Sequence, residues 1–389
     1  MPEALGRITP RPTNSDLSDL SPSGIRRFNA LARQTPGCVS LTLGEPEFDT
    51  PHPIRDAVAV ALDAGMTHYP PNNGTSELLD AISSYMASCG LSFSASQVVV
   101  CAGATEALYA TLASLLDPLD EVIVPTPAFG LYETIVRSCH GRVRTLDTSA
   151  DGFRIDGERL SALVGPRTKA IVVNSPNNPT GCVLDAASLD AVAEVAARTG
   201  IYVVCDDVYA RLVYDDAFER FSARHPELAD RTVVVESFSK PWAMTGWRLG
   251  WLATSPELKS QIEKTHQYMV SSVPAFVQPA ATVALGCDVS PMRDTYAARR
   301  DRVVRALGRM GLPCERPAGA FYAFPRVTGA CPGTESSEEF CVRAIREAGV
   351  ALVPGTCFGC EGYARLSFCC SDELLDEGLR RLAGFVATR

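Results

Sequence analysis

The sequence predicts an α/β protein: a mostly parallel central sheet with helices on both faces, joined to a smaller α+β domain. Two observations support this fold class. Between residues 98 and 235, short apolar runs rich in β-branched residues alternate with helix-length segments, as in βαβ units. After residue 289, an Arg-rich helical segment and short isolated strands follow instead. We therefore expect a large domain over residues 46–288, and a small domain over residues 1–45 and 289–389 that includes an N-terminal arm.

The elements follow from local patterns taken in chain order. Residues 1–20 are rich in Pro, Ser, Thr and Asp and predict an arm rather than a core element. Apolar spacing near 3.6 residues predicts helices, and β-branched runs predict strands. The expected helices are 23–32, 53–64, one from 76, 103–116, 186–198, 256–285 with interruptions, 291–310, 337–348 and 372–388. The expected strands are 39–43, 98–101, 121–124, 170–173, 201–205, 232–235, 319–324, 350–353 and 364–368.

Composition narrows the class of protein. The chain has 389 residues, of which 46% are hydrophobic and 21% charged, as in ordinary soluble enzymes. A formal net charge of -9 argues against nucleic-acid or anionic-membrane partners. The chain shows no run of membrane-spanning length and no apolar signal region, so we expect a cytoplasmic protein.

The 14 cysteines are expected to be free thiols in a reducing compartment. Cys357 and Cys360 form a lone CxxC, and Cys369 and Cys370 follow. We expect no metal there, because no second CxxC or His pair lies nearby in the sequence. The sequence assigns these four residues no role.

Lys240 stands just after the strand-like run Thr232–Val235, between serines and an aromatic residue. An ammonium is costly to bury unless it is paired, loses its proton or is converted to an imine. Ser237 and Arg248 nearby are suited to a phosphate. A lysine beside a phosphate site suggests pyridoxal 5'-phosphate (PLP), which joins an aldehyde and a phosphate in one molecule. Taken alone, the stretch is equally compatible with a surface lysine after a core strand.

Other expected strands also end in residues that fit one ligand, beyond the carboxyl edge of the sheet. Gly103, Ala104 and Thr105 open a helix whose free N–H groups bind an anion, although ordinary capping explains them too. Phe129 follows two prolines and could stack on a flat ring, with core packing as the alternative. The amide of Asn178 could donate to a phenolic oxygen, or only fix a turn.

Charged residues complete this set. Asp206 directly follows an apolar run and needs a cation, such as a protonated pyridine nitrogen; helix capping is the alternative. Tyr209, three residues later, could reach an oxygen on the same ring. Arg365, between apolar residues of a late strand, suits a substrate carboxylate, or faces solvent on an edge strand.

Taken together, these residues resemble the PLP-dependent class I/II aminotransferases of fold type I, over nearly the whole chain. The residue pattern of these motifs is most similar to that of the subgroup of bacterial aspartate, aromatic and N-acetyl-diaminopimelate aminotransferases. The matching stretches are Leu43–Pro46, His68–Gly74, Gly103–Ala107, Asn178–Gly181, Asp206–Tyr209, Ser237–Arg248, Gly319–Tyr322, Val353–Gly359 and Arg365–Phe368. Two departures leave the chemistry intact: Asp207 stands where Glu is frequent, and Phe129 where Tyr or Trp is common.

The resemblance implies a role for each residue toward PLP. Lys240 forms the Schiff base and carries the proton between the substrate Cα and the cofactor. Asp206 pairs with the pyridinium nitrogen, Tyr209 and Asn178 bind the ring hydroxyl oxygen, and Phe129 stacks on the ring. The phosphate is held by Gly103, Ala104, Thr105, Ser237 and Arg248, with Ser239 less firmly assigned.

It also implies substrates and a partner. Arg365, with Asn178 and the Gly44 backbone, binds the substrate α-carboxylate. Tyr69 reaches the phosphate of the neighbouring subunit, which implies a homodimer with shared active sites. The implied reaction is ping-pong transfer of an amino group from an L-amino acid to a 2-oxo acid. The same residues also serve a PLP-dependent lyase, synthase or oxidase, and a regulatory PLP-binding module is a third interpretation. The amino acid and the oxo acid are not determined.

Overall fold

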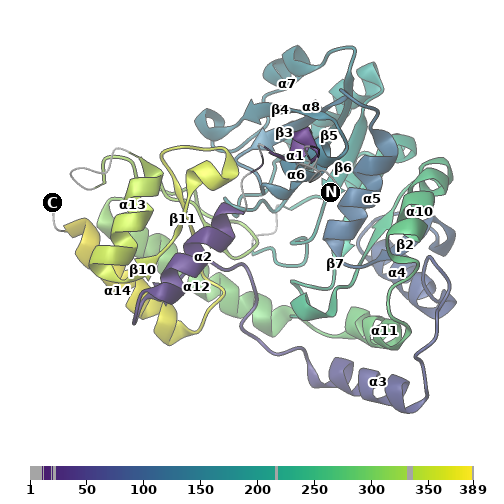
Figure 1. The fold of residues 1–389 in the computed structure, drawn as a ribbon, viewed down its shortest axis with the longest axis horizontal. Helices are drawn as coiled ribbons and strands as arrows, with labels where there is room; N and C mark the ends of the chain where they lie inside the picture. Colours follow the sequence, from purple (N-terminus) through teal and green to yellow (C-terminus); the bar gives the residue numbers. More distant parts are fainter. Residues whose placement is uncertain are drawn as a thin grey trace, which may run out of the picture.

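The computed structural model describes residues 11, 13–18, 20, 23–214, 218–330 and 336–387. Of the expected N-terminal arm, residues 1–10, 12 and 19 lie outside this part of the chain. Figure 1 shows two groups of elements side by side, one built around a large sheet and one around the C-terminal helices.

A sheet of seven strands forms the centre of the larger group (Figure 1), in the order β2-β8-β7-β6-β5-β3-β4. Pairs β4·β3, β3·β5, β5·β6 and β6·β7 are parallel, so the expected mostly parallel sheet is confirmed. Its strands are β2 Val98–Cys101, β3 Glu121–Thr126, β4 Arg142–Asp147, β5 Thr168–Asn174, β6 Tyr202–Asp206, β7 Thr232–Ser237 and β8 Gly250–Ala253.

The sequence patterns missed two of these strands. β4 is an edge strand with mostly exposed, polar residues, so it lacks the apolar run that marks a buried strand. β8 is short, begins with Gly250 and lies in the loop-like stretch after Arg248. It runs antiparallel between β7 and β2, and only this cross-strand pairing identifies it.

Alternate residues of the strands pack against helices on opposite faces of the sheet. Val122, Val172 and Val204 join one apolar cluster, which α5 Ala104–Leu115, α6 Leu131–Ser138 and α10 Pro256–Val270 cover. Ile171 and Val203 join another on the opposite face. The helices of that face are α3 His52–Asp63, α4 Ser76–Ser88, α7 Gly157–Leu163, α8 Ala186–Thr199, α9 Phe221–Arg224 and α11 Gln278–Gly286.

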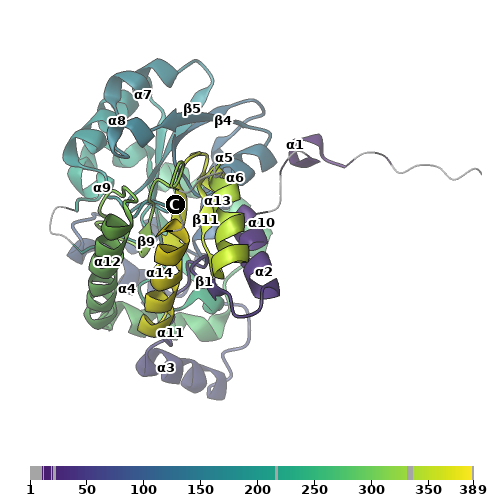
Figure 2. The ribbon, with the colours of Figure 1, turned by 90° about the vertical axis from the view of Figure 1, so that its left-hand side faces the viewer.

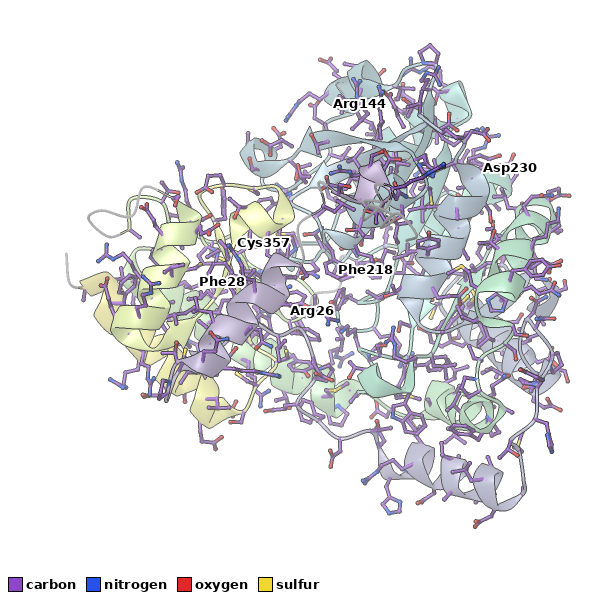
Figure 3. All side chains as sticks on the ribbon, viewed as in Figure 1. Arg26, Phe28, Arg144, Phe218, Asp230 and Cys357 are labelled. Carbon is purple, nitrogen blue, oxygen red and sulfur yellow. The ribbon has the colours of Figure 1, made fainter. Side chains whose placement is uncertain are left out.

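The smaller group joins the two ends of the described chain. Strand β1 Val39–Ser40 pairs in parallel with β10 Val350–Ala351, and Phe28 of α2 Gly24–Gln34 packs in a cluster with C-terminal residues (Figure 3). Figure 2 shows α2 beside the C-terminal helices. The other elements are β9 Tyr322–Ala323, β11 Val353–Pro354, β12 Ala364–Ser367, α12 Ser290–Met310, α13 Ser337–Arg343 and α14 Asp372–Ala387. A short α1, Ser15–Ser18, lies within the expected arm.

Several expected strands here are shorter than the patterns indicated. The segment expected as strand 319–324 forms only a two-residue strand, because Ala320 has a φ of 54° and bends the chain. The expected strand 350–353 divides into β10 and β11, which belong to different sheets. The boundaries of the two domains at residues 46 and 288 stay a prediction.

Within the described residues, no single helix has the length and apolar character needed to cross a membrane. One pair passes that test only when joined, Pro256–Val270 with Ala275–Gly286, and it bends by 118°.

Candidate active site

A cavity of about 380 Å³ lies at the carboxyl ends of β6 and β7 and is also lined by residues from the smaller group of elements. It collects side chains from segments far apart in the sequence. Among its lining residues are twelve that the sequence singled out: Gly44, Ala104, Thr105, Phe129, Asn178, Asp206, Tyr209, Ser237, Ser239, Lys240, Arg248 and Arg365.

Lys240 lies in the turn that follows β7 and is partly buried. Its Nζ donates a hydrogen bond to the Gly44 carbonyl oxygen at 2.7 Å. Burial lowers the pKa of Lys240 to about 8, and Arg365 and Arg248 add to this effect, while Cys369 and Glu45 oppose it. An appreciable fraction of the amine is therefore neutral near pH 7 to 8, as a nucleophile or a proton acceptor requires.

Asp206 ends β6 with its side chain buried. Its Oδ2 accepts a hydrogen bond from the Tyr132 hydroxyl at 2.6 Å, and its Oδ1 accepts a longer one from the Val208 amide at 3.4 Å. In the described chain, no cationic side chain forms an ion pair with it. Burial raises the pKa of Asp206 to about 6, although the Tyr132 hydrogen bond and the Lys240 charge lower it. A buried carboxylate of this kind favours a cationic ligand.

The turn before α5 is shaped for an anion. Gly103 has a φ of 82° and gives the helix no side-chain cap, so the first N–H groups of α5 are available to an anion. A Cβ at Gly103 would lie 2.9 Å from a guanidinium nitrogen of Arg248, so only glycine allows Arg248 to lie so close. Arg248 is fixed by its hydrogen bond to the Thr245 carbonyl at 3.0 Å. Ser237, buried at the end of β7, lines the same cavity.

Arg365 of β12 is 1% exposed and reaches the cavity from the smaller group of elements. It donates hydrogen bonds to Asn178 Oδ1 at 2.9 Å and to the Thr42 carbonyl. Its guanidinium lies over the ring of Tyr322, 4.5 Å from the centroid. Its Nε is buried with no hydrogen-bond partner among the described residues, so a carboxylate in the cavity would complete its set of acceptors.

Two tyrosines, Tyr209 and Tyr322, line the cavity together with Asp206 and Arg365. The hydroxyl oxygens of Tyr209 and Tyr322 are 2.8 Å apart, and both side chains are buried. Gly44 lies against the same group, since a Cβ there would be 1.9 Å from the Tyr322 hydroxyl oxygen. Phe129 is partly buried and meets Tyr132 edge to ring, with centroids 6.3 Å apart. A flat ligand therefore has an aromatic wall next to the carboxylate of Asp206.

Sequence reasoning gave no role to two residues of this site. Tyr132 lies in the first turn of α6, and no local sequence pattern indicates that its hydroxyl reaches Asp206. Tyr322 was quoted in a matching stretch, but only the fold shows that its hydroxyl meets Tyr209. Gly103 contacts Arg248 without lining the cavity, and Tyr69 is 89% exposed and does not line it either.

The cysteines singled out in the sequence are free thiols, including Cys357 and Cys360 of the CxxC (Figure 3 labels Cys357). Cys369 is buried and lies 3.2 Å from the Leu43 carbonyl oxygen, near Lys240. Burial raises the pKa of Cys357 and Cys360, which opposes formation of the reactive thiolate.

Comparisons with known proteins agree with this geometry. The family model for aminotransferase class I and II matches residues 36–382. The chain is 37% identical to a probable N-acetyl-LL-diaminopimelate aminotransferase of Bacillus subtilis, covering 96% of this chain and 95% of that protein. It is 38% identical to the aspartate aminotransferase of Pyrococcus abyssi, covering 95% and 97%.

Solved structures give the same result. The aspartate aminotransferase from Thermus thermophilus with maleate superposes with a TM-score of 0.90 at 34% identity, covering 96% of this chain and 99% of that one. The enzyme from Rhizobium meliloti gives 0.93 at 33%, covering 97% and 99%. Both are similar in fold to this chain throughout its length. The chain therefore belongs to the class I and II aminotransferase family, whose members are PLP-dependent enzymes that transfer amino groups.

Proposed function

We propose that this chain binds PLP in the cavity described above and uses Lys240 as its catalytic amine. The observation that most strongly supports this proposal is that Lys240 and Asp206 line one cavity with no ion pair between them. PLP fits both, because its aldehyde reacts with an amine and its protonated ring nitrogen is the cation that a buried carboxylate requires. The Gly103 turn and Arg248 suit its phosphate.

In this proposal each part of the cofactor is held by its own set of residues in or beside the cavity. Gly103, Ala104, Thr105, Ser237 and Arg248 hold the phosphate, with Ser239 beside them. Asp206 holds the ring nitrogen, Phe129 covers a ring face, and Tyr209 and Asn178 donate to the ring hydroxyl oxygen. Tyr132 keeps the Asp206 carboxylate ionised by donating to it, which is the state that pairs with a protonated ring nitrogen.

PLP, when bound, supplies an electrophilic carbon for the substrate amine and a ring that withdraws negative charge from the substrate Cα. The remaining steps belong to the protein. Arg365 and Asn178 bind the α-carboxylate and so fix which Cα bond faces Lys240. Lys240, with a pKa of about 8, would take the proton from the substrate Cα at its Nζ and hold it there for return in the same turnover. The Gly44 carbonyl, which accepts from Nζ, orients the lysine when its amine is free.

The reaction transfers an amino group from an amino acid to a 2-oxo acid, and we propose a ping-pong order in which both substrates use Arg365 in turn. The names of the relatives favour transfer over elimination or oxidation. Their named substrates differ, since they include aspartate, N-acetyl-LL-diaminopimelate and arginine with pyruvate. We propose an L-α-amino acid as donor and leave its side chain open.

A second copy of the chain completes the site in this proposal. Tyr69 is 89% exposed, and Tyr268, at 88%, also carries a large exposed aromatic side chain. The loop of Tyr69 is joined to the end of α10 by a hydrogen bond from Asn72 to the Ser271 carbonyl. Exposed aromatic side chains of this size favour a protein contact. We therefore propose a homodimer in which Tyr69 reaches the partner's phosphate site. We also propose a cytoplasmic location.

The visible spectrum tests the proposal directly. Purified protein with PLP should be yellow, and a panel of single amino acids without any oxo acid should bleach it as the amino group moves to the cofactor. Adding a 2-oxo acid should restore the colour. Release of ammonia or consumption of oxygen in place of reversible bleaching would contradict transfer, and a protein that PLP cannot colour would contradict the whole assignment.

A further inference from the structure

A buried charged pair, Glu106 and His266, lies directly behind the turn that the proposed function assigns to the phosphate. Glu106 is 7% exposed and His266 fully buried. Glu106 Oε1 is 3.0 Å from His266 Nδ1, and Glu106 Oε2 accepts from the Ala102 amide at 2.9 Å. Neither residue lines the cavity. The pair therefore contacts the backbone of the turn without being able to touch a ligand.

The hydrogen bonds define the protonation of this pair. His266 Nε2 lies 2.8 Å from the Asn72 carbonyl oxygen, which can only accept, so Nε2 carries a hydrogen. Nδ1 faces a carboxylate oxygen and therefore also carries one when Glu106 is ionised. Burial opposes a charged imidazole, but the hydrogen bonds to Glu106 and Asn72 and the charges of Glu106 and Glu263 raise the pKa of His266. With Glu106 ionised, these hydrogen bonds make the pair an imidazolium beside a carboxylate.

The location of Glu106 makes its charge important. It lies in the first turn of α5, whose N-terminal N–H groups face the proposed phosphate site. An unpaired carboxylate buried there would oppose the binding of a phosphate that carries the same sign of charge. His266 comes from α10, and its Nε2 contacts the Asn72 carbonyl in the loop between α3 and α4.

The same residues could be considered as a metal site, because Cys101 Sγ lies within 4.8 Å of the Glu106 and His266 ligand atoms. Both imidazole nitrogens of His266 are already hydrogen-bonded, and Glu106 Oε2 accepts from the backbone. Burial and the neighbouring Glu106 also raise the pKa of the Cys101 thiol, which opposes the thiolate that a metal requires. The geometry favours an internal ion pair.

We propose that His266 is a positioning residue that neutralises Glu106, so that Glu106 can hold the Ala102 amide and fix the turn without repelling the cofactor phosphate. This inference rests on the proposed function, because it concerns the phosphate of PLP. It predicts that His266 affects binding of a phosphate-bearing ligand far more than binding of the same ring without a phosphate.

The test compares PLP with pyridoxal, which has the same ring and aldehyde but no phosphate. Both are titrated into the full-length protein after removal of cofactor. In His266→Gln, the amide can still donate toward Asn72 while the positive charge is lost. We expect its dissociation constant for PLP to rise about tenfold, the scale of an outer partner of a ligand site. The constant for pyridoxal should change by less than about twofold.

The double variant Glu106→Gln with His266→Gln separates charge from shape. Its amide oxygen can still accept from Ala102, and no buried charge remains, so PLP affinity should return to within about threefold of the native value. His225→Gln is the matched control, because His225 is partly buried and also bridges two carboxylates, Asp190 and Glu227, but does not line the cavity. It should change neither constant.

Three outcomes would overturn the inference alone: equal loss of PLP and pyridoxal binding in His266→Gln, no loss of either, or no recovery in the double variant. If His266→Gln does not fold, a folded double variant with near-native PLP affinity supports the charge argument, and an unfolded one overturns it. A native protein that binds neither compound would overturn the proposed function as well.

Discussion

Replacing Asp206 by asparagine should make the cofactor-free protein more stable while weakening its hold on PLP. The folded protein raises the pKa of Asp206 from 3.8 to about 6, chiefly through burial. At about 1.4 kcal/mol per pKa unit, the ionised carboxylate therefore costs about 3 kcal/mol of folding free energy at pH 8. The asparagine side chain carries no charge and can still accept from Tyr132, so most of this cost should disappear.

The pH dependence of the unfolding free energy shows in which direction Asp206 acts. The folded state holds the Asp206 proton to higher pH than the unfolded state, so the cost develops as pH rises from about 4 to 6 and is constant above. The stability advantage of Asp206→Asn should therefore be about 3 kcal/mol at pH 8 and about half of that at pH 5. Urea unfolding of the cofactor-free proteins at the two pH values measures it, with Asp63→Asn as an exposed control.

With PLP bound the order should reverse, because the native carboxylate then pairs with the ring nitrogen and the neutral amide of the variant does not. If cofactor-free Asp206→Asn is less stable than the native protein at pH 8, the ionised Asp206 carboxylate does not destabilise the empty site. That result would refute the argument that this buried carboxylate requires a cationic ligand. An advantage that does not depend on pH between 5 and 8 would show that its origin is packing and not ionisation.

Three further substitutions test the catalytic groups. Lys240→Ala should reduce transfer by about 10²- to 10⁴-fold while Lys264→Ala, at an exposed position of α10, leaves it unchanged; undiminished turnover in the first variant would contradict the mechanism. Arg365→Lys cannot bind a carboxylate through two parallel N–H groups, so KM for the amino donor should rise about 10- to 100-fold, and an unchanged KM would place the carboxylate elsewhere. Gly44→Ala should lower activity by displacing the Tyr322 hydroxyl, which a Cβ would approach to 1.9 Å, and a crystal structure with Tyr322 unmoved would disprove this.

Much of the fold could be predicted because its signals are local. Buried parallel strands need continuous apolar runs, and β5, β6 and β7 lie close to the runs the sequence shows. Lys240 and Asp206 were recognisable for the same reason, since a charged residue at or just beyond the end of a buried strand is costly and unusual. Edge strand β4 and the antiparallel strand β8 could not be predicted in this way. They are strands because they pair with neighbouring strands, and no local sequence pattern indicates that pairing.

The sequence by itself determined which chemical groups stand at the strand ends, because local apolar patterns indicate which segments are buried strands and in what order they follow. Only the tertiary structure decided that Arg365, 187 residues beyond Asn178, donates to it, and that Tyr132 donates to Asp206. It alone also paired Glu106 with His266. These contacts form where separate elements dock, and docking depends on the shape of whole packed surfaces, so no short stretch of sequence contains them.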